Sequence, residues 1–385
     1  MIDDAAKPAH GLNAHLIGVP GGRWRLNTPS LIVDLDLLDE NIATMARRCA
    51  AENIALRPHA KTHKSICIAK RQLAAGAVGI CCAKLGEAEI IAAGGISSIL
   101  VTSPVVSEEG GRRLAALNRL CPELMIVTDS AANVDLLAAS GAASGRPLKV
   151  LIDLDVGQHR TGIAPGKDAI ALAERIAASP DLGLAGIQGY AGHLQHLHGR
   201  GEREAGTLAA MALLAGTRAA LEARGFACPI VTGGGTGTFD LDPRAAVLTD
   251  LQAGSYIFMD GQYADVWEAD AERVPFATSL FVQTMVISAN HPGLATTDAG
   301  LKAFATDAGP PRIVAGAPDG TRYVLGSDEQ GKLELGPGET LAPGAVLTCA
   351  VPHCDPTVNL YDHYHVVRGD TLVDIWPVDA RGRSQ

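Results

Sequence analysis

The stretch Leu56-Arg57-Pro58-His59-Ala60-Lys61-Thr62-His63-Lys64-Ser65 decides the fold that we predict for this chain. An apolar run, Ile54-Ala55-Leu56, enters the stretch like a buried strand, and a helix-like run at residues 65–75 leaves it. Lys61 therefore lies where a strand has ended and a helix is about to begin. In an α/β barrel this is the end of the strand at which functional residues are placed.

The surroundings of Lys61 point to a chemical role. Other cationic or titratable side chains crowd it in the sequence: Arg57, His59, His63 and Lys64. Positive neighbours favour the neutral amine of a lysine, which is the form that can make a Schiff base. A basic loop on a solvated surface would have the same composition, so the prediction for Lys61 depends on the rest of the chain.

The first 268 residues repeat a pattern of a short apolar run followed by a helix-like segment. Eight such runs occur, at residues 54–60, 78–83, 98–102, 124–128, 148–154, 184–190, 229–232 and 250–258. Helical patterns are found at residues 37–51, 85–94, 107–119, 130–139, 166–178 and 202–224. Eight buried strands alternating with helices predict a parallel (β/α)8 TIM barrel. A doubly wound sheet is the alternative, but no Gly-x-Gly-x-x-Gly signature follows the first strand.

The alternation of apolar runs and helical patterns ends at about residue 268. Short strands between Gly/Pro turns are predicted at residues 280–286, 322–325, 346–349 and 365–367. We therefore expect a barrel at residues 30–268 and a second, mostly β domain at residues 269–385, joined by residues 1–29. The strand near residues 31–34 precedes the barrel, and its pairing with the β domain would make that domain discontinuous in sequence.

Composition restricts the partners and the compartment. The net charge is −10, and the basic residues are scattered, which argues against nucleic acid and anionic membranes as partners. A small-molecule ligand is the expectation. The eight cysteines include no Cys-x-x-Cys pair, which argues against a disulfide framework or a structural zinc site. Since the sequence has neither an export signal nor an 18-residue apolar run, we expect a soluble, cytoplasmic protein.

A glycine-rich loop follows the seventh predicted strand, Val231-Thr232-Gly233-Gly234-Gly235-Thr236-Gly237-Thr238. It offers unhindered backbone N–H groups and hydroxyls, which suit a dianionic phosphate. Barrels commonly bind phosphate after strands seven and eight, although a mobile loop is the alternative. The residues predicted to bind phosphate are Thr232, Gly234, Gly235 and Thr236, completed after the next strand by Gly254, Ser255 and Tyr256.

Lys61 and this loop are neighbours in a closed barrel, because strand eight pairs with strand one. A cofactor that carries both an aldehyde and a phosphate would span them. Pyridoxal 5'-phosphate has this chemistry, so it is the predicted cofactor.

Together with Lys61 and the glycine-rich loop, the stretch Asp153-Leu154-Asp155-Val156-Gly157-Gln158-His159-Arg160-Thr161-Gly162 resembles the alanine-racemase-like (fold type III) pyridoxal-phosphate enzymes. The resemblance implies that Arg160 contacts the phenolic oxygen of the cofactor and that Tyr190 packs against its pyridine ring. A salt bridge from Arg160 to Asp153 or Asp155 is the structural alternative.

A more specific resemblance, over about residues 27 to 380, is to the D-threonine aldolase branch of these enzymes. It is carried by Arg57-Pro58-His59-Ala60-Lys61, Gly79-Ile80-Cys81-Cys82, Gly233-Gly234-Gly235-Thr236-Gly237, Gly309-Pro310-Pro311 and His353-Cys354-Asp355-Pro356-Thr357. The chain departs from the racemases at one point. Where they place an arginine against the pyridine nitrogen, this chain offers the neutral Gln252, so the nitrogen need not be held in the racemase's electronic state.

His353 and Asp355 lie two residues apart, on one face of the segment if it is extended, with Cys354 on the other face. An imidazole and a carboxylate suit a divalent ion such as Mn²⁺, Mg²⁺, Co²⁺ or Zn²⁺, with Mn²⁺ as our prediction. A solvated turn is the alternative for the pair alone. The resemblance implies that the pair binds the aldolase metal, whereas the related D-serine dehydratases have His-x-Cys.

Several histidines follow the sixth predicted strand. The resemblance matches His196 to the histidine near the aldolase metal, and we predict that it takes part in catalysis. His193 and His198 have no such match and are expected to be peripheral.

The resemblance implies a D-threonine aldolase that cleaves D-β-hydroxy-α-amino acids into glycine and an aldehyde, and we expect a homodimer. A D-3-hydroxyaspartate aldolase is the first alternative, and it would require a further cation, for which Lys64, Arg203 or Arg322 are available. A dehydratase that expels the hydroxyl group and a non-catalytic pyridoxal-phosphate carrier are the other two.

Overall fold

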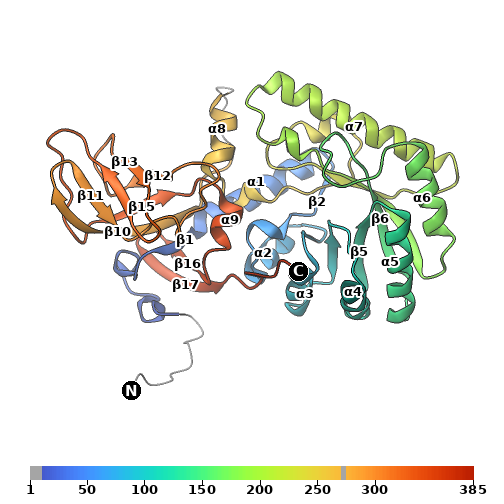
Figure 1. Ribbon diagram of the computed structural model, residues 1–385, viewed down its shortest axis with the longest axis horizontal. Helices are drawn as coiled ribbons and strands as arrows, with labels where there is room; N and C mark the ends of the chain where they lie inside the picture. The colour runs from blue at the N-terminus through green and yellow to red at the C-terminus, as the bar shows by residue number, and fades with distance from the viewer. Residues whose placement is uncertain (1–10, 270–274) are drawn as a thin grey trace, which may run out of the picture.

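The computed structural model describes residues 11–269 and 275–385 and contains two sheets, with the parallel one on the right in Figure 1. The parallel sheet consists of β2 (Ala55–Leu56), β3 (Ile80–Cys82), β4 (Ser98–Val101), β5 (Glu123–Thr128), β6 (Leu148–Asp153), β7 (Leu182–Gly189), β8 (Ile230–Gly233) and β9 (Asp250–Leu251). The helices associated with it are α1 (Leu35–Ala51), α2 (Ile66–Ala74), α3 (Leu85–Ala93), α4 (Glu108–Leu120), α5 (Ala131–Ser144), α6 (Lys167–Ala177) and α7 (Arg200–Glu222). The predicted eight-stranded barrel is confirmed.

The sheet closes on itself. Its strand order is β2-β9-β8-β7-β6-β5-β4-β3, and a bridge between His59 and Cys81 joins the continuation of β2 to β3. β2 pairs in parallel with β9, so the eighth strand does lie beside the first. This pairing brings the loop that carries Lys61 next to the loops that follow β8 and β9.

Buried apolar side chains explain both kinds of element. The strands are short and nearly continuous in apolar residues, as in β4, where Ile99, Leu100 and Val101 are fully buried. In α1 the buried side chains recur at helical spacing, and Asp34 caps the helix by accepting a hydrogen bond from the backbone N–H of Leu37 at 3.2 Å. The periodicity in the sequence therefore follows from helices that pack on a parallel sheet.

The second sheet contains mostly antiparallel strands. They are β1 (Ser30–Asp34), β10 (Leu280–His291), β11 (Leu294–Thr297), β12 (Arg312–Ala315), β13 (Arg322–Leu325), β14 (Gly331–Glu334), β15 (Val346–Ala350), β16 (His363–Arg368) and β17 (Thr371–Pro377). The predicted β domain is confirmed as a fold class.

Strand β1 lies between β10, to which it is antiparallel, and β16, to which it is parallel. A domain boundary at residue 30 would assign β1 to the barrel, but β1 pairs with the second sheet. This pairing is the one expected if the β domain is discontinuous in sequence. The division at residue 268 and the role of residues 1–29 stay proposals, and residues 1–10 lie outside the described residues.

The second domain is anchored to the loop that carries Lys61. The hydroxyl of Tyr364 donates to the carbonyl of His63 at 2.6 Å, and the backbone N–H of Ala380 donates to the carbonyl of Lys64 at 2.9 Å. Two short helices, α8 (Gly261–Ala269) and α9 (Cys354–Val358), lie between the sheets. The junction of the two domains therefore coincides with the functional end of the first barrel strand.

None of the helices in the described ranges is long and apolar enough to cross a membrane. All eight cysteines are free thiols, and seven of them are buried.

Candidate active site

A cavity of about 640 Å³ lies at the carboxyl ends of the barrel strands. It brings together nine of the residues predicted for the site: Lys61, Arg160, Tyr190, Gly234, Gly235, Thr236, Gln252, Gly254 and Ser255. A larger hollow of about 900 Å³ in the β domain is lined by none of the predicted site residues. The smaller cavity is therefore the candidate active site.

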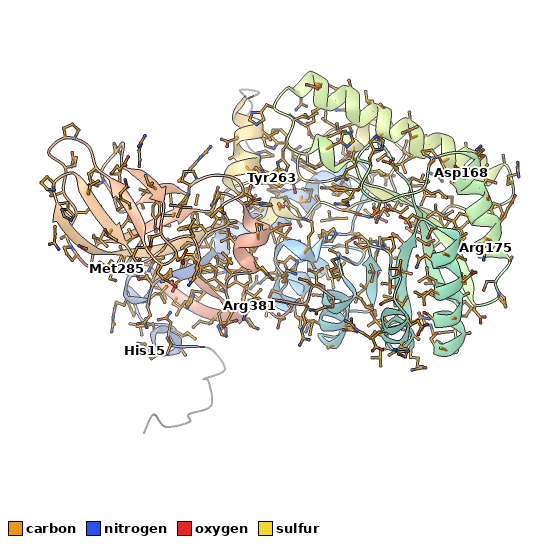
Figure 2. The ribbon with its side chains drawn as sticks, in the orientation of Figure 1. His15, Asp168, Arg175, Tyr263, Met285 and Arg381 are labelled. Atoms are coloured by element: carbon orange, nitrogen blue, oxygen red, sulfur yellow. The ribbon has the colours of Figure 1, made fainter. Side chains whose placement is uncertain are left out.

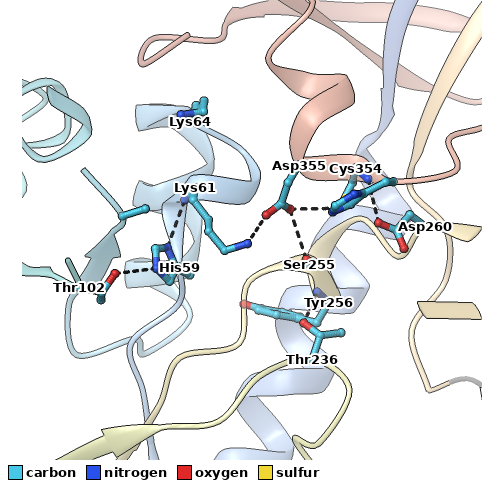
Figure 3. Close-up of polar contacts among 12 residues, drawn as sticks. His59, Lys61, Lys64, Thr102, Thr236, Ser255, Tyr256, Asp260, Cys354 and Asp355 are labelled. Atoms are coloured by element: carbon cyan, nitrogen blue, oxygen red, sulfur yellow. Dashed lines mark hydrogen bonds and ion pairs between the residues drawn. The ribbon is translucent and has the colours of Figure 1, made fainter. Parts of the chain in front are cut away.

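Lys61 lies in the short 3-10 helix Ala60–Thr62, directly after β2, and its side chain points at Asp355 of α9 (Figure 3). The two form an ion pair across the domain junction. Burial lowers the pKa of Lys61 and is the largest single effect, but the charge and hydrogen bond of Asp355, together with Tyr190 and Cys354, raise the pKa above its ordinary value. The expectation that the surroundings favour the neutral amine of Lys61 is therefore wrong.

The cationic neighbours fail to lower the pKa of Lys61 because their charges are neutralised elsewhere. Arg57 pairs with Asp250 at 3.5 Å, and Lys64 pairs with Glu87 inside the protein. Burial lowers the pKa of His59 to about 3 and that of His63 to about 3, so both imidazoles are neutral at pH 7. The positive charge predicted around Lys61 from its sequence neighbours is therefore cancelled by ion pairs and by burial in the folded protein.

The glycine-rich loop after β8 is held from behind by Gln195. Its Oε1 accepts from the backbone N–H of Gly237 at 2.9 Å, and its Nε2 donates to the hydroxyl of Thr238 at 3.0 Å. Gly234 has a φ of +71°, and a Cβ at Gly235 would lie 2.4 Å from Oε1 of Gln195. The glycines are therefore required both by the turn and by close packing against this amide.

The loop leaves several donors available to an anion. Within the described chain, the backbone N–H groups of Gly234, Thr236, Gly254 and Ser255 have no hydrogen-bond partner. Thr236 accepts from the backbone N–H of Tyr256 at 3.1 Å, which leaves its own hydroxyl hydrogen free. Four backbone donors and a hydroxyl at the ends of β8 and β9 can bind a phosphate without a cationic side chain.

Two residues predicted to bind phosphate lie outside the cavity. Thr232 is fully buried and donates its hydroxyl to Asp250. The side chain of Tyr256 is also fully buried, and its hydroxyl accepts from Nε2 of Gln72 at 3.0 Å. Tyr256 therefore supports the cup only through its backbone bond to Thr236, and the prediction that its hydroxyl completes the cradle is wrong.

Arg160 and Tyr190 pair with each other at the wall of the cavity, where the guanidinium lies 5.3 Å from the ring centroid. The carboxylates that could have bound Arg160 have other partners. Asp153 accepts from Thr161 at 2.8 Å, and Asp155 pairs with His159 at 2.6 Å. The alternative salt bridge is not found among the described residues, and Arg160 faces the cavity.

His353 and Asp355 do not lie on an extended segment, because α9 begins at Cys354 and places Asp355 in its first turn. Nδ1 of His353 lies 2.6 Å from Oδ2 of Asp307, a contact that leaves Nε2 as the ring atom able to bind a metal. Burial raises the pKa of Asp355 and is the largest single effect, but the charge and hydrogen bond of Lys61, together with His353 and Thr62, lower the pKa well below its ordinary value, so the carboxylate is ionised. These donors fit a hard or borderline divalent ion.

His196 lies near this pair. Its ring centroid is 4.6 Å from that of Tyr263, which lies at the junction of the domains in Figure 2. Burial, with the nearby charges of His353 and Lys61, lowers the pKa of His196 to about 4, and its buried Nδ1 has no hydrogen-bond partner among the described residues. His193 and His198 are exposed, as expected of peripheral residues.

The described residues contain no group of three or more acidic, histidine or cysteine side chains arranged to hold a metal. An ion on His353 and Asp355 would therefore keep several water or substrate ligands. Such incomplete protein coordination is ordinary for Mg²⁺.

The cations considered for a second substrate carboxylate are engaged elsewhere. Lys64 pairs with Glu87, Arg203 is buried in α7 and donates to the carbonyl of Leu197, and Arg322 pairs with Glu334 on the β domain. Lys84 lines the cavity instead, and within the described chain it has no ion-pair partner.

Three contributors were missed from the sequence, namely Gln188, Tyr263 and Asp307, and no role was predicted for Gln195. Gln195 and Gln188 are glutamines at or after a strand end, a signal available in the sequence. Asp307 and Tyr263 come from segments whose approach to the site depends on how the two domains pack, which no local pattern encodes.

Two family models of known proteins match separate parts of the chain. Residues 33–262 match the family model of the alanine racemase N-terminal domain, and residues 279–367 match that of a serine dehydratase domain. A D-threonine aldolase of Arthrobacter sp. is 40% identical over 94% of each chain, and a 3-hydroxy-D-aspartate aldolase of Paracoccus denitrificans (strain Pd 1222) is 37% identical over 93% of each. The crystal structure of D-threonine aldolase from Filomicrobium marinum superposes with a TM-score of 0.89 at 37% identity, covering 94% of this chain and 97% of that one.

Proposed function

The chain belongs to the alanine-racemase-like, fold-type III family of pyridoxal-phosphate enzymes, and on this premise we propose that it is a D-threonine aldolase that depends on a divalent metal ion. It cleaves D-β-hydroxy-α-amino acids into glycine and an aldehyde. Relatives that act on D-threonine and on 3-hydroxy-D-aspartate are almost equally similar, so the choice between them depends on the site.

The observation that carries the proposal is the arrangement of one cavity. Lys61, the backbone cup at Gly234 and Thr236, and the Arg160–Tyr190 pair all line it. These residues hold the aldehyde, the phosphate and the ring of pyridoxal phosphate, respectively. When bound, the cofactor supplies an electron sink for negative charge at the substrate's Cα.

The second part of the proposal concerns the proton of the substrate's β-hydroxyl. His353 and Asp355 would hold the metal ion, and such an ion would supply the Lewis acidity that lowers the pKa of that hydroxyl. His196 is neutral at pH 7 because its pKa is lowered to about 4, mainly by burial, so it is in the state that accepts a proton. Asp307 orients His353 by pairing with its Nδ1.

The site also bears on the substrate. The cations that a hydroxyaspartate aldolase was expected to use are engaged elsewhere, which favours D-threonine. 3-Hydroxy-D-aspartate is the second candidate substrate, because Lys84 lines the cavity and could supply the cation for its side-chain carboxylate. We further propose a cytoplasmic homodimer with Mn²⁺ as the ion, consistent with eight free thiols and two protein ligands.

Incubation with single substrates tests the proposed function. With added pyridoxal phosphate and Mn²⁺, D-threonine is expected to give glycine and acetaldehyde at a higher rate than 3-hydroxy-D-aspartate gives glycine and glyoxylate. Mass spectrometry and an aldehyde assay identify the products. Release of ammonia would instead assign a dehydratase, faster cleavage of 3-hydroxy-D-aspartate would assign the second candidate, and no product would contradict both.

Gly235→Ala is expected to weaken the affinity for pyridoxal phosphate by at least about 10-fold. The new Cβ would meet Gln195, the loop would shift, and one or two hydrogen bonds to phosphate would be lost, each worth about 1.5–3 kcal/mol. Fluorescence titration of the apoprotein measures the effect. Gly216→Ala, in α7, is the matched control, because its Cβ would meet nothing within 4 Å. Equal affinities in the two folded variants would refute the phosphate assignment.

A further inference from the structure

The floor of the cavity carries a set of buried hydrogen bonds centred on Gln252. This side chain lines the cavity and is only 5% exposed. Its Nε2 lies 3.0 Å from Oε1 of Gln188 and 3.0 Å from the hydroxyl oxygen of Thr232. Each of these two partners is in turn bound to a buried carboxylate.

Asp153 fixes the direction of the hydrogen bonds on one side. Its two oxygens accept from Thr161 at 2.8 Å and from Nε2 of Gln188 at 2.9 Å. Burial raises the pKa of Asp153, but Nε2 of Gln188 also lies 3.5 Å from the carbonyl oxygen of Thr102, which can only accept, so Gln188 directs its amide nitrogen toward this side. Oε1 of Gln188 then faces Gln252 and requires a donor there.

Asp250 fixes the direction on the other side. It is paired with Arg57 at 3.5 Å and accepts the hydroxyl hydrogen of Thr232. A threonine hydroxyl has one hydrogen, so its oxygen can only accept from Gln252. The two buried carboxylates thus impose the same orientation on the Gln252 amide from both sides.

Both N–H groups of Gln252 are consumed by this network, and only Oε1 remains. Oε1 accepts no hydrogen bond from the described residues, and it is not among the buried polar atoms that lack a partner, so it is accessible from the cavity. A ligand atom that lies next to it must therefore be a donor. The opposite orientation would leave Gln188 and Thr232 without donors, at a cost of about 1–3 kcal/mol for each buried group.

The position of Gln252 selects the atom of the cofactor. Lys61 and the phosphate cup bind adjacent substituents of the pyridine ring, and the ring nitrogen lies opposite the aldehyde carbon. Gln252 directly follows β9, which lies between the strands that lead to Lys61 and to the cup, and it precedes Gly254 by two residues. Among the ring atoms of pyridoxal phosphate only the nitrogen can carry a hydrogen for a hydrogen bond, so it is the ring atom that Oε1 of Gln252 can bind.

We propose that Oε1 of Gln252 accepts a hydrogen bond from the ring nitrogen of pyridoxal phosphate, so that the bound cofactor carries a proton on that nitrogen. The proton comes from solvent when the cofactor binds. A protonated ring withdraws electrons more strongly than a neutral one, which suits the cleavage of a Cα–Cβ bond. This inference rests on the proposed function, since it requires pyridoxal phosphate in the cavity.

Nuclear magnetic resonance of the protein loaded with cofactor labelled with ¹⁵N in the ring tests the inference without measuring activity. The ¹⁵N shift is expected to match that of free cofactor at a pH where its ring is protonated. In Gln252→Leu it should move toward the value of neutral pyridine. Gln283→Leu, which alters a buried glutamine of the β domain, is the control and should leave the shift unchanged.

A second measurement uses the unaltered protein, in case Gln252→Leu does not fold. A cofactor analogue with carbon in place of the ring nitrogen should bind about 10- to 100-fold more weakly than pyridoxal phosphate, the scale of one hydrogen bond to a charged group. Equal affinities, or a neutral-pyridine shift in the unaltered protein, would overturn the inference while leaving the proposed function in place. Failure of the protein to bind any labelled cofactor would overturn both.

Discussion

Replacing Lys61 with alanine is expected to abolish both the covalent attachment of pyridoxal phosphate and the cleavage of D-threonine. Lys61 is the lysine placed directly after β2, within reach of the phosphate cup. Removing the group that forms a covalent bond with a cofactor or substrate commonly costs a thousandfold or more in rate. Borohydride reduction followed by peptide mass spectrometry should find cofactor on Lys61 in the unaltered protein and none in the variant.

Lys61→Arg separates the covalent role from the ion pair. Arginine keeps the positive charge beside Asp355 but cannot take up the aldehyde, so it should preserve the fold and lose the reducible cofactor. Lys70→Ala, on the exposed side of α2, is the neutral control. A reducible linkage that survives in Lys61→Ala would transfer the role to Lys84, which lines the same cavity, rather than to Lys64, which is buried against Glu87.

The barrel could be predicted because its signals are local. Each strand is an apolar run of a few residues and each helix carries its own period, so all eight strands were located before their neighbours were known. The glycine-rich loop followed for the same reason, since β8 and β9 lead directly to the residues that form the cup. Fixed strand order then placed Lys61 beside that cup.

The electrostatics of the site could not be predicted, because they depend on residues distant in sequence. Arg57 and Lys64 appeared to surround Lys61 with charge, but Asp250 and Glu87 neutralise them, and Asp355 arrives from the other domain. The backbone at Asp355 was misjudged for a related reason. A five-residue helix carries too little periodicity to distinguish it from an extended segment, and tertiary contacts stabilise α9.

Removal of the divalent ion is expected to abolish cleavage while leaving the cofactor attached. The proposed ligands lie on the β domain, where Asp355 reaches the site through its ion pair with Lys61, whereas the phosphate cup and Arg160 belong to the barrel. Dialysis against a chelator should therefore leave the visible absorption of the lysine-bound cofactor unchanged and stop glycine formation. Adding Mn²⁺ or Co²⁺ should restore it.

His353→Ala is the cleaner of the two ligand variants. Asp355 also pairs with Lys61, so Asp355→Ala would remove the charge that raises the pKa of Lys61 and would disturb the cofactor as well as the metal. His353 contacts Asp307 instead, so its loss should raise the Mn²⁺ concentration needed for half-maximal activity about 10- to 100-fold, with the cofactor spectrum unchanged. His198→Ala, which alters an exposed histidine, is the matched control. Full activity in a chelated, metal-free sample would show that the pair is structural, and His196, already neutral at pH 7, would then take the hydroxyl proton unaided.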